Sequence, residues 1–126
     1  MNQFLESREL IRRLKKGFPV RLEEDEVRLP RFTEIVETEC DEYGVSGSME
    51  LIVALSPTAT WCIWAANRKA KVGAADGKRF MKVLDAVAER YPQRPVRGWL
   101  LTPATIDASV RTQLAEAGHY AHQVPL

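Results

Sequence analysis

The chain has 126 residues, a formal net charge of +1, a hydrophobic content of 45% and a charged content of 28%. This length predicts one domain, residues 1–126, with a single core that needs no disulfide framework. The longest apolar run falls far short of the ~20 residues of a membrane-spanning helix. The first residues also lack the apolar stretch of a secretory signal, so we expect a cytoplasmic protein. No C-x-x-C pair is present, which excludes a zinc ribbon.

The charges are sorted along the chain. Residues 23–42 hold nine carboxylates and two arginines, whereas residues 68–82 hold six Lys or Arg and one Asp. Between them, residues 49–66 are apolar except for Glu50. Charge sorted in this way sets up a local field and indicates an anionic partner at the basic end.

Apolar spacing predicts a helix over residues 2–17, which Gly17 and Pro19 end. Residues 20–28 alternate only weakly and are typical of a short edge strand or a loop. Residues 32–40 alternate more clearly, which predicts a strand.

Two short runs, residues 49–55 and 60–66, are apolar and rich in β-branched and aromatic side chains. The four residues between these two runs, 56–59, suit a hairpin loop. Strands that are apolar on both faces are typical of the centre of a sheet with helices packed on it. Trp61 and Trp64 fall on opposite faces of the second run, and we interpret both as core residues.

A second helix is expected over residues 77–90, with Asp76 as its N-cap, followed by a strand over residues 96–101. Thr102 and Pro103 are typical of the cap and first position of a third helix.

Gly118 would end that third helix, and residues 119–124 would form a last short strand. The order of elements predicts an α/β domain of mixed type with a mixed central sheet. The connection through the second helix should be a right-handed crossover.

Two sites in this order carry polar residues suited to metal chemistry. Glu50 starts one apolar strand, and the triplet Asn67-Arg68-Lys69 has the N-x-K form after the next. Together with the order α-β-β-β-α-β, these residues resemble the restriction-endonuclease-like superfamily, the PD-(D/E)xK nucleases. That resemblance covers residues 2–124 as topology and implies a mixed sheet flanked by helices, followed by a further helix and a short strand.

The resemblance implies a site as well. In that family an acid on the second core strand and an acid-x-Lys on the third bind one or two divalent metals, and the Lys positions or activates the attacking water. Carried over, Glu50 and Asn67 would coordinate Mg²⁺, and Lys69 would stand beside the water as the third catalytic residue. Asn67 and Lys69 would share one face of an extended strand. Glu34, and Glu6 or Glu9, are expected nearby.

The sequence departs from the family pattern at three points. Glu replaces the usual Asp at position 50, no proline precedes it, and the acid of the triplet is the neutral Asn67. In a register two residues earlier, Ala65-Ala66-Asn67 would fill the triplet and leave no ligand. Glu50 is otherwise interpreted as a solvated residue at the strand end.

Four basic residues are candidates for binding nucleic acid: Lys71, Lys78, Arg79 and Lys82. Three of them fall in the first turns of the expected second helix, where the backbone amides favour phosphate. The alternative is that these four residues form only a solvated surface that binds no ligand. His119 and His122 form H-x-x-H, which on a strand puts them on opposite faces and makes a poor metal pair.

Three functions stay open. The first is a Mg²⁺-dependent nuclease that handles nucleic acid. The second is the same fold acting as a nucleic-acid-binding module without catalysis. The third is a protein-interaction module, such as an inhibitor, an immunity protein or a subunit of a complex, in which the acidic segment 23–42 docks on a basic partner.

Overall fold

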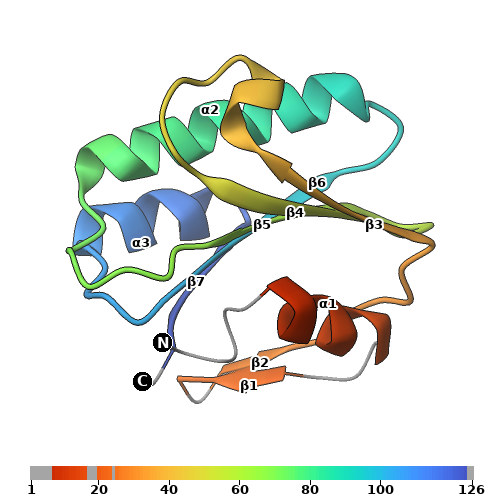
Figure 1. Ribbon diagram of the computed structural model, residues 1–126, viewed down its shortest axis with the longest axis horizontal. Coiled ribbons are helices and arrows are strands. Elements are labelled where there is room, and N and C mark those ends of the chain that lie inside the picture. Colours follow the sequence, from red (N-terminus) through yellow and green to blue (C-terminus); the bar gives the residue numbers. More distant parts are fainter. Residues whose placement is uncertain (1–6, 17–19, 24, 125–126) are drawn as a thin grey trace.

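The computed structural model describes residues 7–16, 20–23 and 25–124 (Figure 1). A five-stranded sheet in the order β3-β4-β5-β6-β7 forms its centre. Strands β3, β4 and β5 are antiparallel neighbours, and β5, β6 and β7 run parallel. The bounds are β3 Glu34–Glu39, β4 Glu50–Leu55, β5 Thr60–Ala65, β6 Val96–Thr102 and β7 Tyr120–Gln123.

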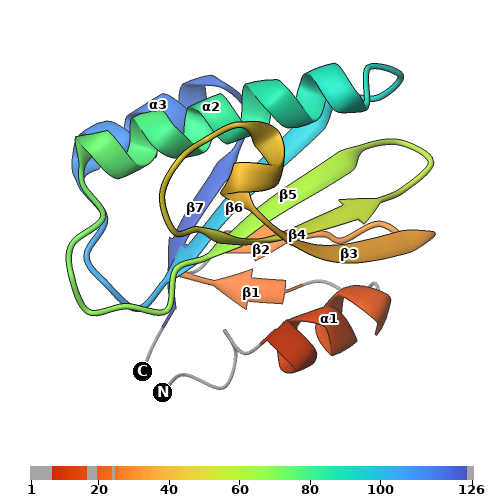
Figure 2. The same ribbon diagram turned by 45° about the horizontal axis from the view of Figure 1, so that its top comes forward.

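Helices cover both faces of this sheet, as Figures 1 and 2 show. Helices α2 (Ala74–Arg90) and α3 (Ala108–Glu116) lie on one face, which we call the α2 face. Helix α1 (Ser7–Lys16) and a two-stranded sheet of β1 (Val20–Leu22) and β2 (Asp25–Val27) lie on the other, the α1 face. The order of elements and the mixed sheet confirm the predicted α-β-β-β-α-β fold class, with its further helix and strand.

Each face of the sheet has its own core, because β4 and β5 are apolar on both sides. Trp64 and Leu51 pack with Phe80 on the α2 face, whereas Trp61 and Ile63 pack on the α1 face. Trp61 and Trp64 are 5% and 3% exposed, which confirms the interpretation of both as core residues.

The predicted start of the second helix is wrong by three residues. Helix α2 begins at Ala74 with Gly73 as its N-cap, and Asp76 is its third residue. The Asp76 carboxylate accepts the Gly73 backbone N–H at 3.0 Å, so it caps the helix from inside the first turn. An Asp can cap a helix from the N-cap position or from the third helical position, so the sequence does not determine the residue at which α2 starts.

The predicted start of the third helix is also wrong. Thr102 belongs to β6, and its hydroxyl accepts the Ala104 N–H. Helix α3 begins at Ala108, after Asp107, whose carboxylate accepts the Ser109 N–H as an N-cap. The chain stays extended before this cap because Ile106 forms a parallel bridge with Val72.

The weakly alternating segment 20–28 forms the β1–β2 hairpin, which turns near Glu23 at a φ of 50°. Helix α1 confirms the first predicted helix over the part that can be compared, because residues 2–6 and Gly17 to Pro19 lie outside the described residues. Within the described ranges, no helix is long and apolar enough to cross a bilayer.

Candidate functional site

Glu50 is the first residue of β4 and is exposed. The next residue, Leu51, packs on the α2 face, so the alternation along the strand directs Glu50 to the α1 face. Its cross-strand partner is Glu39 on β3, and Glu37 shares the same face two residues earlier. These three carboxylates line one shallow hollow and concentrate negative charge there.

A second hollow of about 260 Å³ brings Glu50 and Asn67 together, as the resemblance implies. Ser48, Ala65 and Arg68 also line it. The structure therefore places the expected oxygen donors of β4 and of the segment after β5 at one common place.

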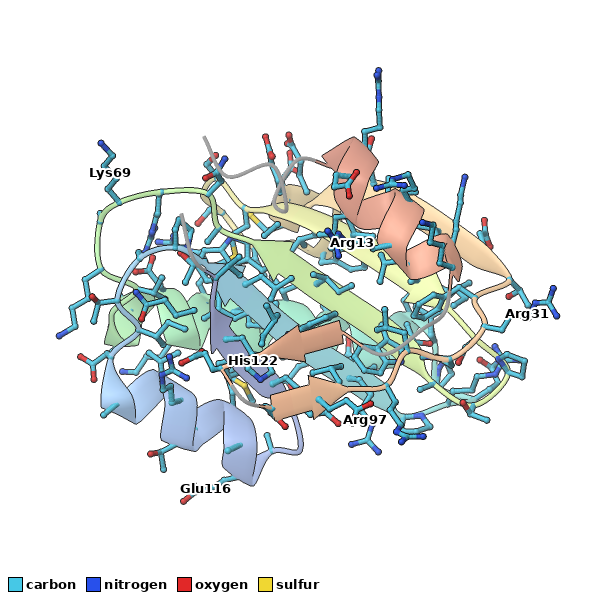
Figure 3. All side chains as sticks on the ribbon, turned by 90° about the horizontal axis from the view of Figure 1, so that it is seen from below. Arg13, Arg31, Lys69, Arg97, Glu116 and His122 are labelled. Carbon is cyan, nitrogen blue, oxygen red and sulfur yellow. The ribbon has the colours of Figure 1, made fainter. Side chains whose placement is uncertain are left out.

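Lys69 does not join them. Strand β5 ends at Ala65, and the Asn67 N–H donates to the Ala65 carbonyl at 3.1 Å, which folds the chain out of the strand. Lys69 lies in the following bend and projects away from the body of the molecule (Figure 3). The prediction that Asn67 and Lys69 share one face of an extended strand is wrong, because this turn intervenes.

Arg68, which was not among the predicted site residues, holds the loop after β5 in place. Its guanidinium contacts the Asp76 carboxylate at 2.6 Å and lies over the Trp64 ring, 5.6 Å from the centroid. Burial raises the pKa of Asp76, but the hydrogen bonds from Arg68 and the Gly73 N–H outweigh it, and the net pKa is below its usual value. The spacing of Trp64 and Arg68 does not indicate this contact, because four residues bring side chains together on a helix and not across the end of a strand.

The basic residues of the loop and α2 differ in their partners. Lys71 lies 3.6 Å from the Asp107 carboxylate, whereas Lys78 and Lys82 are exposed on the outer side of α2. The Arg79 side chain lies against Gly47, where an added Cβ would meet it at 3.2 Å. The Asp76 carboxylate in the first turn of α2 accepts the Gly73 N–H, so this helix start carries an acid as well as the three cations, and phosphate binding there stays a prediction.

The residues around Glu50 do not fit a Mg²⁺ centre of the nuclease kind. The register that pairs Leu51 with Trp64 puts Ala65 beside Glu50, where that chemistry needs a second acid. In the hollow that holds Glu50, Asn67 and Ser48 offer only neutral oxygens, whereas Mg²⁺ prefers an octahedron of oxygen ligands that includes carboxylates. The carboxylates of Glu37 and Glu39 line the other hollow. In the parts of the chain that the structure describes, no three His, Cys, Asp or Glu side chains form a group suited to a metal ion.

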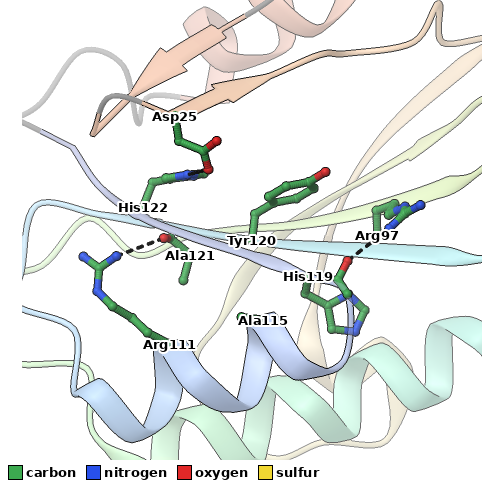
Figure 4. Close-up of a pocket in the computed structure, with 9 residues that line it drawn as sticks. Asp25, Arg97, Arg111, Ala115, His119, Tyr120, Ala121 and His122 are labelled. Atoms are coloured by element: carbon green, nitrogen blue, oxygen red, sulfur yellow. Dashed lines mark hydrogen bonds and ion pairs between the residues drawn. The ribbon is translucent and has the colours of Figure 1, made fainter.

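The two histidines lie on opposite faces, as predicted (Figure 4). His119 Nδ1 accepts the Gly98 N–H at 2.8 Å on the α2 face. His122 is buried on the α1 face, where its Nδ1 accepts the Trp99 indole N–H at 2.9 Å and its Nε2 contacts the Asp25 carboxylate at 2.8 Å. Burial, and then the charge of Arg97, lower the pKa of His119, while Asp85 acts in the opposite direction.

Comparisons with known proteins give little beyond this geometry. No protein-family model matches the chain, and no curated protein does. A solved structure of an EndoMS–dsDNA complex is similar with a TM-score of 0.48 and 11% sequence identity. The similarity covers 99% of this chain and 46% of that chain, so this chain spans less than half of the matched protein.

Proposed function

We propose that this chain is a nucleic-acid-binding domain of nuclease-like architecture whose catalytic site is degenerate. The observation that supports the proposal is an unbalanced basic rim on the loop after β5 and the first half of α2. Three of its cations, Lys69, Lys78 and Lys82, have no ion pair within the described residues, and Arg79 acts on Asp76 only through its charge. The other two cations of residues 68–82, Arg68 and Lys71, pair with Asp76 and Asp107.

The basic rim adjoins the hollow that holds Glu50. Arg79 lies against Gly47, and the next residue, Ser48, lines that hollow together with Asn67. A phosphodiester chain held by the basic rim would therefore pass over the mouth of the hollow. Cations placed in this way bind phosphates whatever the base sequence, and the affinity falls steeply with salt.

Salt-dependent binding of DNA tests this proposal. We expect the Lys78→Gln/Lys82→Gln variant to bind a DNA oligonucleotide several-fold more weakly and to lower the slope of log K against log salt by about 1.8 on duplex DNA. The matched control is Arg8→Gln/Lys15→Gln, which removes two exposed charges from α1 on the opposite face. Equal losses in the two variants, or no binding by the native chain at low salt, would contradict the proposal.

The lack of an acid at Ala65 and Asn67, on the β5 side of Glu50, leads to a separate expectation about magnesium. Without a bound cation, the Glu50 carboxylate repels a phosphodiester at the mouth of the hollow. Glu50→Gln should therefore strengthen DNA binding a few-fold, equally with and without Mg²⁺. If Mg²⁺ strengthens binding by the native chain and Glu50→Gln removes that effect, a metal centre is present and the degenerate site is refuted.

A metal-dependent phosphodiesterase stays the second candidate, because Glu50 and Asn67 share one hollow. That candidate requires Glu50 and the neutral Asn67 to hold Mg²⁺, which the donors described above do not fit, and it requires Lys69 to leave its outward position. Cleavage of plasmid and single-stranded DNA with Mg²⁺, measured for the native chain, Glu50→Ala and Lys69→Ala, separates the two candidates. Cleavage that both substitutions abolish would support the enzyme, and cleavage that neither affects would refute this site.

A further inference from the structure

The two edges of the central sheet differ in how they are closed. At the β7 edge, Val124 N–H donates to Thr102, so the even-numbered residues of β7 face β6 and the odd-numbered ones face outward. Arg111 donates to the outward Ala121 carbonyl at 3.2 Å, and the Glu23 carboxylate accepts the outward Gln123 N–H.

Arg111 and Glu23 also pair with each other at 3.1 Å, so a side-chain clamp covers this edge. Occupied backbone groups of this kind prevent another strand from pairing with β7.

The β3 edge carries no such clamp among the described residues. Strand β3 pairs only with β4, and Figure 2 shows it along the outer margin of the sheet. Because Cys40 N–H donates to Met49, the even-numbered residues of β3 face β4. The backbone groups of Ile35, Glu37 and Glu39 therefore point outward, where an added strand would meet them.

The side chains of β3 define what such a strand must carry. Glu37 and Glu39 lie on the α1 face, next to Glu50. Val36 lies on the α2 face in a hollow with Tyr43, and at 40% exposure it is the large apolar side chain most open to solvent among the described residues. An added strand that complements this edge has basic residues at alternate positions and an apolar residue opposite Val36.

A second copy of the chain does not meet this requirement. Two β3 edges paired with each other would place glutamates opposite or next to glutamates in either direction, and like charges across strands destabilise pairing. Acidic residues continue into the 3₁₀ helix η2 (Cys40–Tyr43), where Asp41 and Glu42 extend the negative field. Charge complementarity therefore favours a different, basic chain.

We propose that the outer edge of β3 binds an extended basic segment of a partner protein as an additional strand. Backbone hydrogen bonds to Ile35, Glu37 and Glu39 supply the pairing, and the alternating basic residues supply the choice of partner. This proposal is independent of the basic rim, which lies on the loop after β5 and on α2.

A pair of peptides tests strand addition against simple charge attraction. The first is Lys-Thr-Lys-Val-Lys-Thr-Lys with blocked ends, which alternates, and the second is Lys-Lys-Thr-Val-Thr-Lys-Lys, which has the same composition without alternation. We expect the first to bind about tenfold more tightly in a fluorescence anisotropy titration. Equal binding of the two peptides, or no binding of either, would overturn the proposal.

Matched variants locate the binding edge. Glu37→Gln/Glu39→Gln should weaken the alternating peptide about fivefold or more, whereas Glu89→Gln/Glu116→Gln removes two exposed charges from α2 and α3 and should leave binding unchanged. Val36→Lys, at an exposed position that tolerates a long side chain, should weaken it as well.

Glu37→Pro removes one outward N–H and should abolish binding, with circular dichroism as the check on folding. Equal losses in the two Gln variants would overturn the proposal. A concentration-dependent dimer of the native chain that Glu37→Pro removes would also overturn the proposal, because a second copy of the chain would then occupy the β3 edge.

Discussion

The two faces of the central sheet are closed by different means. On the α2 face, two helices bury aliphatic and aromatic residues such as Phe80, Val110 and Leu114 against the sheet. On the α1 face, a ten-residue helix and two strands of three residues each cover Trp99 and its neighbours.

Polar contacts between distant parts of the chain connect the cover of the α1 face to the sheet and to helix α3. His122 contacts Asp25, and Arg111 pairs with Glu23. Short elements bury less apolar surface each, so their attachment depends more on such contacts. We therefore expect the α1 face to open at a lower free energy than the α2 face.

The largest expected effect comes from the core of the α2 face. Phe80 is fully buried, and Phe80→Ala should lower the free energy of unfolding by about 3–5 kcal/mol, measured by urea titration. Leu14 is equally buried under α1, but Leu14→Ala should first expose α1, β1 and β2 to hydrogen exchange while β4 to β6 stay protected. Loss of protection over the whole chain in Leu14→Ala would show that both faces open as one unit.

An intermediate effect is expected from the hydrogen bond inside the α1 face. Trp99→Phe keeps most of the buried ring but removes the donor to His122 Nδ1, which leaves a buried acceptor unpaired. We expect this change to cost about 1–3 kcal/mol more than Trp64→Phe on the α2 face, in thermal or urea unfolding. Equal costs for the two substitutions would show that the hydrogen bond adds no net stability.

The smallest expected effect is a dependence on pH through His119. Its folded-state pKa lies below the unfolded value, so the unfolded chain binds the proton more readily. The stability from His119 is then complete above the unfolded pKa, near 6.5, and decreases as the pH falls from there toward the folded pKa. In urea titrations between pH 8 and pH 5, His119→Gln should lose part of the decrease that the native chain shows, and an unchanged profile would contradict this.

The central strands were predictable because their apolar residues indicate that both faces of each strand are buried and that other elements cover them. Residues 49–55 and 60–66 are apolar on both faces, which only a covered sheet accommodates. Helix starts were less predictable, since Asp76 and Thr102 each have the chemistry of a cap. The backbone bridge between Val72 and Ile106, 34 positions apart, keeps the chain extended before α3. No local sequence pattern indicates this bridge.

The candidate site was predictable in part because two of its residues lie at or next to the ends of neighbouring strands. Glu50 and Asn67 flank a hairpin, so their approach follows from local pairing. The displacement of Lys69 follows from a turn that Arg68 and Asp76 stabilise, and the contact of His122 with Asp25 joins residues 97 positions apart. Contacts of that range depend on the finished fold and leave no periodic signal in the sequence.

The change of strand direction at β5 has a consequence for the order of assembly. Strands β3, β4 and β5 form a meander whose pairings close short loops, whereas β6 and β7 each join through a helical crossover. Short closures lose less chain entropy, so the meander should become ordered in the folding transition state before the parallel strands attach. Folding rates of Val53→Ala and Leu100→Ala provide the measurement: the first should slow folding, and the second should mainly accelerate unfolding.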